Sequence, residues 1–431
     1  MMKKIALSLL LACGGIFCIA PAMAEDSDSV TLRVSWWGAN SRHQNTLKTI
    51  RAFEQAHPNI KVKAEYTGWD GFVSRLSTQI AGKNEPDVMQ LDWSWIQVFS
   101  RSGDGFYDLN QLSKEVGLEN YAGKLGTVTV NGKVQGLPVS LVAPILYYNT
   151  ETWKKVGLAY PKTWDELYAA GKIFKEKLGD NYYPAIVTTS MELINSWMVQ
   201  KYNQPMLNEK GEFTYNEAQW LEFVNVYQKL VNEHVLPSQK YIQSFGKAQP
   251  FEMKPWINGE FGGSNLMSSA VAKYEDTLAP PAKLEVGPYP LLPGAKDAGL
   301  FIKPSMIFAI SRNTKHPKEA AMLMDYMFNQ PEGVALMGLE RGFPVSKAAA
   351  DYVMKSNMAQ PNDPVITGLK LVESMPSDNV YVSPYFKNPE IEQYWLDLTQ
   401  RIDYGKISAE DAAKEFERTA KRALRKHTPM K

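Results

Sequence analysis

The residues best suited to chemistry in this sequence are aromatic. Trp, Tyr and Phe make up 11% of the chain, and two tryptophan pairs, Trp36-Trp37 and Trp93-Ser94-Trp95, stand where strand-like segments end. The carboxyl ends of strands are where open α/β sheets bind ligands. A Trp face can stack on a sugar ring while Asn, Arg and Lys side chains bond its hydroxyls or carboxylates. The alternative is that these rings fill the core, because Trp is highly buried on average.

Residues for metal binding or catalysis are scattered or absent. The chain has no H-E-x-x-H, G-x-S-x-G or G-K-[ST] motif, so we expect no metal, no cofactor and no catalytic residue of these types. Paired carboxylates of the glycosidase kind are set by folding rather than by spacing, so a secreted glycosidase or lyase stays open. The histidines have no partner at helical spacing: His43, His57, His234, His316 and His427.

The composition is that of a globular chain with balanced charge. Its 431 residues are 44% hydrophobic and 22% charged, with 47 Lys+Arg against 46 Asp+Glu and a net charge of +1. This excludes disordered and fibrous classes, and at about 150 residues per domain the length predicts two or three domains. A near-neutral chain has no basic field for nucleic-acid phosphates or anionic lipid. We therefore expect neither partner.

The N-terminus has the pattern of a secretory signal peptide. Lys3 and Lys4 precede an apolar run over residues 5–20, and small residues at 21–24 form an A-x-A cleavage site. We expect residues 1–24 to be removed, with cleavage after Ala24. A membrane anchor is the alternative, but it needs about 20 apolar residues and this run is shorter and broken by glycines.

Both cysteines of the chain lie in this leader. Cys13 and Cys18 would be lost with it, so the mature chain would have no thiol, which fits a bacterial periplasm. A lipoprotein cleavage box at Cys13 is a weaker reading, because the apolar run continues for seven residues past it. Removing Lys3 and Lys4 takes the 47 basic residues to 45 against 46 acidic ones, a net charge of −1.

The first third of the chain alternates strand and helix patterns. Alternating and buried apolar runs predict strands, and apolar residues at helical spacing predict helices between them. This order predicts an α/β fold with a mostly parallel sheet. The strands are expected at Val30–Trp36, Ile60–Tyr66 and Pro86–Leu91, and the helices at Gln44–Ala56 and Gly71–Ala81.

The rest of the chain begins with a hairpin and is then mainly helical. Asn131-Gly132 predicts a type I′ turn within residues 128–134. The apolar stretch Leu137–Tyr148 is long enough to cross between two domains. Further elements are expected as helices at 163–177, 191–201, 217–231 and 318–328, a strand at 306–311, and helices from Ile391 and Ser408 onward.

Several motifs resemble one known family, the extracytoplasmic solute-binding proteins of carbohydrate ABC transporters. The most specific is the G-L-P, Y-Y-N and P-K-T-W-D-E-L series within Gly132–Leu167. Within the family, the pattern including Val34–Thr46 looks most like the oligogalacturonide-binding members of pectin-degrading enterobacteria. The other matching stretches are Ala52–Val62, Pro86–Asp92, Trp256–Asn265 and Arg341–Ser346.

The resemblance implies a fold and a set of partners. It implies the type II periplasmic-binding-protein fold, with two α/β lobes joined by crossing strands and closing over a ligand between them. Lobe 1 would comprise residues 25–142 and 304–343, and lobe 2 residues 143–303 and 344–431. The partners would be the ligand and inner-membrane permease subunits with a cytoplasmic ATPase, and we expect a monomer.

The resemblance also implies ligand-binding residues. Trp36, Trp37, Asn40 and Arg42 would lie in the first strand-to-helix loop of lobe 1. Trp197 and Trp256 could equally be core, and Lys303 and Arg341 could be solvated surface. The remaining implied residues are Trp93 and Trp95 in lobe 1 and Asn265 in lobe 2, with Lys303 at the second crossing and Arg341 at the third.

The sequence thus predicts a periplasmic receptor rather than an enzyme. Its expected ligand is a short acidic oligosaccharide, with galacturonate oligomers from pectin as the particular case. Receptors for neutral oligosaccharides or glycerol-phosphate-type ligands are the alternatives within the family.

Overall fold

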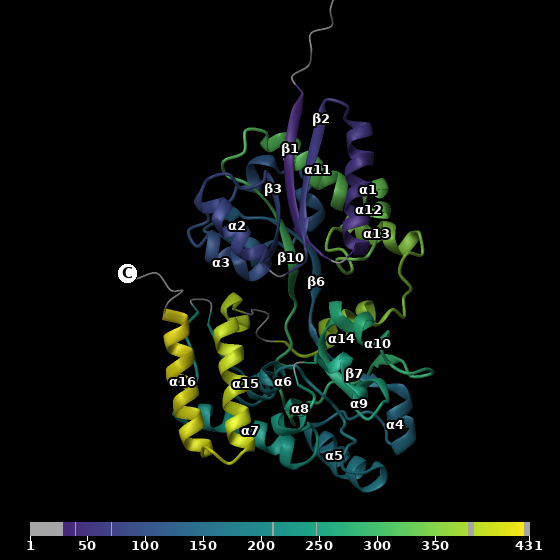
Figure 1. The fold of residues 1–431 in the computed structure, drawn as a ribbon, viewed down its shortest axis with the longest axis vertical. Helices are drawn as coiled ribbons and strands as arrows, with labels where there is room; N and C mark the ends of the chain where they lie inside the picture. Colours follow the sequence, from purple (N-terminus) through teal and green to yellow (C-terminus); the bar gives the residue numbers. More distant parts are fainter. Residues whose placement is uncertain are drawn as a thin grey trace, which may run out of the picture.

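The protein consists of two lobes joined by strands (Figure 1). The structure is a computed structural model that describes residues 29–38, 40–69, 71–208, 211–246, 248–377 and 383–425. The expected signal peptide, residues 1–24, lies outside these ranges. Within them, none of the helices is both long enough and apolar enough to span a membrane.

Lobe 1 is built on a five-stranded sheet of order β2-β1-β3-β10-β6. β1 is parallel to β2 and β3, whereas β10 is antiparallel to β3 and β6. The prediction of a mostly parallel sheet is therefore right for the first three strands and wrong for β10, which enters from lobe 2 and runs the opposite way. The strands are β1 (Val30–Trp37), β2 (Ile60–Thr67), β3 (Val88–Asp92), β6 (Leu137–Val142) and β10 (Lys303–Ile310).

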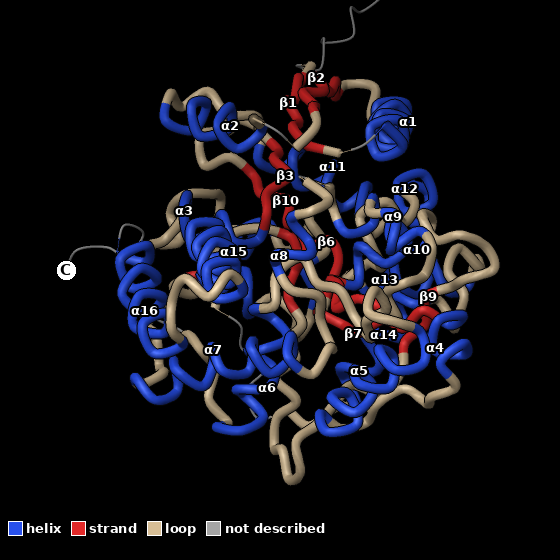
Figure 2. Tube along the Cα trace, turned by 60° about the horizontal axis from the view of Figure 1, so that its bottom comes forward, coloured by secondary structure: helices blue, strands red, loops and turns tan. Residues whose placement is uncertain are grey.

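Helices cover both faces of this sheet (Figures 1 and 2). α1 (Asn40–Ala56) lies on one face with α11 (Pro317–Phe328), α12 (Pro331–Met337) and α13 (Lys347–Lys355). α2 (Phe72–Ala81) and α3 (Ile96–Phe99) lie on the other face. Alternate β1 residues Leu32, Val34 and Trp36 are fully buried, as expected for a strand covered by helices.

The first crossing between the lobes is one nearly continuous strand. β6 ends at Val142 in the sheet of lobe 1, and β7 (Pro144–Asn149) begins two residues later in a three-stranded antiparallel sheet of order β8-β7-β9. The prediction that Leu137–Tyr148 crosses between two domains is confirmed. The partner strands in lobe 2 are β8 (Gly263–Met267) and β9 (Leu284–Val286).

Two chain passages between the lobes, β6 and β10, meet a third segment, residues 338–346, at Ser140. Its hydroxyl hydrogen-bonds the hydroxyl of Ser305 in β10 and donates to the carbonyl of Arg341. Ser140 also forms a β-bridge with Pro344. This fully buried serine therefore links β6, β10 and the segment 338–346 at the hinge.

Most of the predicted elements are present. The hairpin of β4 (Thr129–Val130) and β5 (Lys133–Val134) has positive φ at Asn131 (49°) and Gly132 (78°), as a type I′ turn requires. The predicted helices correspond to α1, α2, α5, α6, α7, α11, α15 and α16, whereas the other described helices were not predicted. The helices of lobe 2 are α4 (Thr150–Val156), α5 (Trp164–Leu178), α6 (Met191–Tyr202), α7 (Glu217–Asn232), α8 (Gln239–Gln243), α9 (Lys254–Ile257), α10 (Val271–Glu275), α14 (Pro364–Ser374), α15 (Pro389–Asp403) and α16 (Ala409–Arg425).

The second passage back to lobe 2 follows α13. α13 packs on α12, where Ala349 and Val353 share a buried cluster with Val334. α14 instead contacts β9 of lobe 2. We therefore propose that lobe 1 extends through α13, beyond the boundary at residue 343 that the motifs suggest.

An ion pair between α15 and α16 supplies a test of stability against pH. Nη1 and Nη2 of Arg401 donate to the Glu415 carboxylate at 2.7 and 3.0 Å, and the Tyr394 hydroxyl donates to the same carboxylate. These hydrogen bonds lower the pKa of Glu415 to about 2. Because the pKa in the folded protein is below the unfolded value of about 4.3, the stabilisation is present above that value and is lost as pH falls towards 2.

We expect Glu415→Gln to lower the free energy of unfolding by about 1 kcal/mol at pH 7, since the pair is partly exposed. The difference from wild type should vanish near pH 2 in urea unfolding curves. Glu417→Gln, which breaks only the Lys421 pair on the same helix, is the control and should cost about 0.5 kcal/mol or less. An equal loss for Glu415→Gln at both pH values would contradict the assignment.

Candidate functional site

Three tryptophans from three strand ends form one aromatic cluster in lobe 1. Trp37 ends β1, Trp69 follows β2, and Trp95 lies in the short turn Trp93–Trp95 that follows β3. The ring centroids are 5.2 Å apart for Trp37 and Trp69, 5.3 Å for Trp37 and Trp95, and 5.6 Å for Trp69 and Trp95. Trp69 is 55% exposed, whereas Trp37 is buried beneath it. The cluster therefore offers a stacking surface at the carboxyl edge of the sheet.

Trp69 was not among the predicted site residues. It stands two residues beyond the end of β2, at the same sheet edge as the predicted pairs. Its position directly after a predicted strand could have indicated that it belongs to this sheet edge. A search based on paired tryptophans missed it because Trp69 is single.

Arg42 lies on the first turn of α1 rather than in a loop. The helix begins at Asn40, four residues before the predicted Gln44, so the placement of Asn40 and Arg42 in the strand-to-helix loop is wrong. The first turn of α1 contains no acidic residue. Negative charge is favoured at a helix N-terminus, so this site carries a cation where the helix dipole favours an anion.

Among the described residues, the Arg42 guanidinium bonds main-chain oxygens and no carboxylate. Nη1 donates to the carbonyl of Trp37 at 3.4 Å and Nη2 to the carbonyl of Glu340 at 2.7 Å. Nε is buried and has no partner among the described residues. The Glu340 carboxylate accepts from Ser41 instead, at 2.9 Å. Burial lowers the pKa of Arg42, and the charge of Glu340 offsets part of this effect.

Arg341 lies behind Arg42 and is almost completely buried, at 4% exposure. Its Nε donates to Gln90 Oε1 at 3.0 Å and its Nη2 to Thr46 Oγ1 at 3.1 Å. Nη1 has no partner within the described ranges. Burial, and next the nearby charge of Arg42, lower the pKa of Arg341 well below its usual range. The predicted direct ligand contact is therefore unsupported for Arg341, whose atoms are covered in this structure.

The two arginines give this edge of lobe 1 a positive charge that Glu340 compensates only in part. Neither forms an ion pair with a carboxylate in the part of the chain that the structure describes. Glu340 is the one acidic group that acts on both of them. A site of this kind can bind an anion, and a carboxylate is the shape that a guanidinium bonds best.

Lys303 lies at the hinge, beside the aromatic turn. It begins β10 and is 8% exposed, with Nζ 5.5 Å from the centroid of the Trp93 ring. Its Nζ also donates to the carbonyl of Pro304 at 3.3 Å. A cation on a Trp face at the crossing between the lobes adds positive charge near the same edge.

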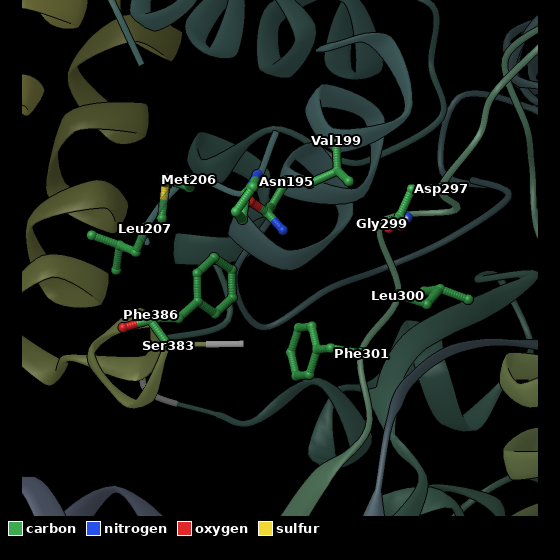
Figure 3. A pocket seen from close by; sticks show the side chains of 11 residues that line it. Asn195, Val199, Met206, Leu207, Asp297, Gly299, Leu300, Phe301, Ser383 and Phe386 are labelled. Atoms are coloured by element: carbon green, nitrogen blue, oxygen red, sulfur yellow. Dashed lines mark hydrogen bonds between the residues drawn. The ribbon is translucent and has the colours of Figure 1, made fainter. Parts of the chain in front are cut away.

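Lobe 2 contributes a small pocket close to this edge (Figure 3). Its cavity volume is about 30 Å³, and its apolar walls include Phe301 and Phe386, whose ring centroids are 5.8 Å apart. Asn195 is 7% exposed, and its Oδ1 has no partner among the described residues. A cavity of this size has room for about one water molecule, which the Asn195 amide oxygen could bond. Its lining is Asn195, Val199, Pro205, Met206, Leu207, Asp297, Gly299, Leu300, Phe301, Ser383 and Phe386.

One short turn brings this pocket to lobe 1. Phe386 belongs to the turn Pro384–Lys387, which contacts the turn Trp93–Trp95. Next to it, the Tyr385 hydroxyl donates to Gln97 Oε1 of α3 at 3.3 Å. The lobe 2 pocket and the lobe 1 aromatic cluster thus adjoin where the lobes meet.

Three predicted ligand-binding tryptophans are core residues. Trp36 and Trp256 are fully buried and Trp93 is 2% exposed. Each indole N–H is bonded within the protein: Trp36 to His43 Nδ1 at 3.0 Å, Trp93 to the Thr127 carbonyl at 2.8 Å, and Trp256 to the Tyr274 carbonyl at 3.0 Å. The prediction of direct ligand contact is corrected for these three, because no ring face is open.

Trp197 and Asn265 lie apart from the aromatic cluster. Trp197 is half-buried on α6, with Lys201 Nζ 5.1 Å from its ring centroid. Asn265 lies in β8 opposite Leu146, and its Oδ1 has no partner in the described chain. Their role in binding stays a prediction.

The fold and the site define a two-lobed solute-binding protein with an aromatic, positively charged edge. The family of bacterial extracellular solute-binding proteins matches residues 43–333. The chain belongs to this family.

Related proteins, two of them of known structure, agree with this assignment. A periplasmic oligogalacturonide binding protein from Yersinia enterocolitica, solved with saturated digalacturonic acid, is 50% identical with a TM-score of 0.86, covering 93% of this chain and 100% of its own. A periplasmic solute binding protein from Pectobacterium atrosepticum is 46% identical with a TM-score of 0.89 over the same shares, 93% and 100%. A multiple sugar-binding protein of Streptococcus mutans is 25% identical over 334 residues, 74% of this chain and 75% of its own.

The contrast between Trp256 and Trp69 supplies a stability test. We expect Trp256→Ala to lower the free energy of unfolding by about 3–5 kcal/mol, because it empties a large buried site. Trp69→Ala should cost about 1.5 kcal/mol or less, since the ring is mostly in solvent and loses only edge and stacking contacts. Urea unfolding followed by circular dichroism measures both. Similar losses for the two variants would contradict the assignment of Trp69 to an open surface.

Proposed function

We propose that the protein is the periplasmic solute-binding component of an ABC importer and that its ligands are short acidic oligosaccharides, namely oligogalacturonides. It would hold the ligand between its lobes and deliver it to the permease subunits in the inner membrane. A signal peptide over residues 1–24, a periplasmic location and a monomeric state belong to the same proposal. The observation that carries it is the Arg42–Arg341 pair, which lacks an ion-pair partner among the described residues, together with the exposed Trp69 ring that packs against Trp37 at the same sheet edge.

A galacturonate residue has chemistry that matches both features. Its carboxylate would displace water at Arg42. Two charge-assisted hydrogen bonds from the guanidinium can then offset the hydration that the carboxylate loses. The buried charge of Arg341 strengthens this attraction from behind. The apolar face of a pyranose ring would stack on Trp69, as sugar rings do on tryptophan. A neutral sugar would make only the stacking contact with Trp69.

The related Yersinia protein supports the same ligand class. It is 50% identical over 93% of this chain and is described as bound to saturated digalacturonic acid. Half of the residues differ, so the ligand of this chain is inferred from its own arginines as well as from that relative. The competing ligands fit this edge less well. Neutral oligosaccharides carry no anion for the arginines, and glycerol-phosphate-type molecules have no sugar ring to stack on Trp69.

We propose further that the protein leaves its ligand unchanged. The contacts proposed for the ligand come from the Arg42 guanidinium and the Trp69 ring, which bind and orient but are poor general acids or bases at neutral pH. A pectin-active glycosidase or lyase would need a positioned acid and base at the scissile bond. The role is therefore that of a receptor.

The test of the ligand is calorimetric titration with trigalacturonate and with its methyl ester. Charged hydrogen bonds contribute about 1.5–3 kcal/mol, so Arg42→Ala should weaken binding of the acid roughly tenfold to a hundredfold. Arg341→Met and Lys303→Met should weaken it less, because these charges act from buried positions. Binding of the ester should change little in all three variants. Trp69→Ala should weaken acid and ester alike, because stacking does not involve the carboxylate.

Arg51→Ala is the matched control, since Arg51 is exposed on the same helix. It should bind both ligands as wild type does. If wild type prefers the ester, or if Arg42→Ala binds the acid unchanged, the ligand proposal is wrong. New reducing ends or unsaturated products in the titrated mixture would overturn the receptor role.

A second expectation concerns closure of the lobes. Ligand contacts made by both lobes exist only when the lobes close, so binding should shift the protein towards a closed form. Small-angle scattering should show a smaller radius of gyration with saturating trigalacturonate than without it. The methyl ester at the same molar excess serves as the control. An unchanged radius at saturation would show that the passages at Ser140 do not act as a hinge.

A further inference from the structure

A second aromatic surface lies on the other side of β1 from Trp69. Tyr66 of β2 is 43% exposed and stacks on Trp36, with ring centroids 5.0 Å apart and an interplanar angle of 23°. His43 of α1 packs beside it, 4.6 Å from the Tyr66 ring centroid. Trp36 and Tyr66 are direct partners in the strand register, so their side chains share one face of the sheet. Trp37 and its cluster occupy the opposite face.

His43 is held in a defined chemical state by Trp36. The indole Nε1–H donates to His43 Nδ1 at 3.0 Å, so Nδ1 is an acceptor and the ring proton is on Nε2. Nε2 has no protein partner among the described residues. His43 therefore presents a neutral N–H donor beside the open face of Tyr66.

The charged groups around His43 keep it neutral. Arg42 is the preceding residue on α1, and Arg341 and Glu340 come from the segment 338–346 packed against that helix end. Burial, and then the charges of Arg42 and Arg341, lower the pKa of His43. Protonation would also turn Nδ1 into a donor and break its bond with Trp36. A neutral donor suits a hydroxyl oxygen, whereas the adjacent guanidinium suits a carboxylate.

We propose that Tyr66 and His43 form a second sugar subsite, which takes the ring next to the one held at Arg42 and Trp69. Tyr66 stacks on the apolar face of that ring, and His43 Nε2 donates to one of its hydroxyl oxygens. Arg42 lies between the two aromatic surfaces, because it bonds the carbonyl of Trp37 at the end of β1. The inference rests on the proposed oligosaccharide ligand and adds that the ligand spans the end of β1 with two neighbouring rings.

The test is titration of trigalacturonate into variants that separate the two contacts. Asn carries an acceptor where His has Nδ1, so His43→Asn keeps the bond to Trp36 but lacks the Nε2–H. We expect it to bind about tenfold more weakly, with an unfolding temperature close to wild type. Tyr66→Ala should bind roughly tenfold more weakly, and Tyr66→Phe should bind as wild type does because stacking needs only the ring.

Two matched controls are available in lobe 2. Tyr404 is exposed to a similar degree, 46%, so Tyr404→Ala controls for loss of a surface ring. His234 has φ of 61°, which Asn tolerates, so His234→Asn controls for loss of a histidine. Neither variant should change the affinity. His43→Asn and Tyr66→Ala binding as tightly as wild type, or no more weakly than the controls, would overturn the second subsite.

The outcomes separate this inference from the proposed function. Failure of wild type itself to bind trigalacturonate would reject the ligand, whereas binding that ignores His43 and Tyr66 would reject only the subsite. Nuclear magnetic resonance of the histidine nitrogens adds an independent readout. His43 should be neutral with its proton on Nε2 between pH 7 and 8, and the Nε2 signal should shift when trigalacturonate is added. A proton on Nδ1, or an imidazolium in the complex, would contradict the inference.

Discussion

Two guanidinium groups held close together without a carboxylate partner are the constraint around which this end of lobe 1 is arranged. Arg341 bonds Gln90 and Thr46, and Arg42 bonds the carbonyls of Trp37 and Glu340. These acceptors are neutral, so they satisfy hydrogen bonds without cancelling charge. Each arginine is buried enough to lower its own pKa, and the charge of Arg42 lowers that of Arg341 further. Such an arrangement is costly in the free protein and is relieved when an anion binds.

The hinge explains how this charged edge can serve a ligand shared by two lobes. Ser140 hydrogen-bonds Ser305 and the carbonyl of Arg341, so the same residue that ties the crossing segments also touches the buried arginine. The turn Pro384–Lys387 reaches from lobe 2 to the Trp93–Trp95 turn of lobe 1. Movement of the lobes and the position of the charged edge are therefore connected through direct contacts.

Strongly periodic segments could be predicted from the sequence, and the details of side-chain burial could not. β1, α2 and the crossing at Leu137–Tyr148 followed from apolar alternation, helical spacing and length. The helices α12 and α14 were missed because each contains a glycine, which weakens the helical pattern, and α12 is only seven residues long. β10 was predicted as a strand, but its antiparallel direction depends on its entry from lobe 2.

The sequence indicated the sheet edge at which the aromatic cluster forms, but not which of its rings are open. Trp36 and Trp37 are consecutive, so they point to opposite faces, and both are buried for different reasons: Trp36 by α1 and Trp37 by Trp69 and Trp95. Trp69, Tyr66 and His43 escaped notice because their importance comes from neighbours distant in the chain. Arg42 was predicted correctly as a residue of this edge, although its place on a helix turn was not.

The most direct test of the central claim is a crystal structure of the protein with digalacturonate. If Arg42 is reserved for the ligand, a carboxylate oxygen should lie about 2.7–2.9 Å from a nitrogen of its guanidinium group. The apolar face of the same sugar ring should cover Trp69. A complex in which the carboxylates face solvent or other cations, while Arg42 still bonds only the carbonyls of Trp37 and Glu340, would contradict the account.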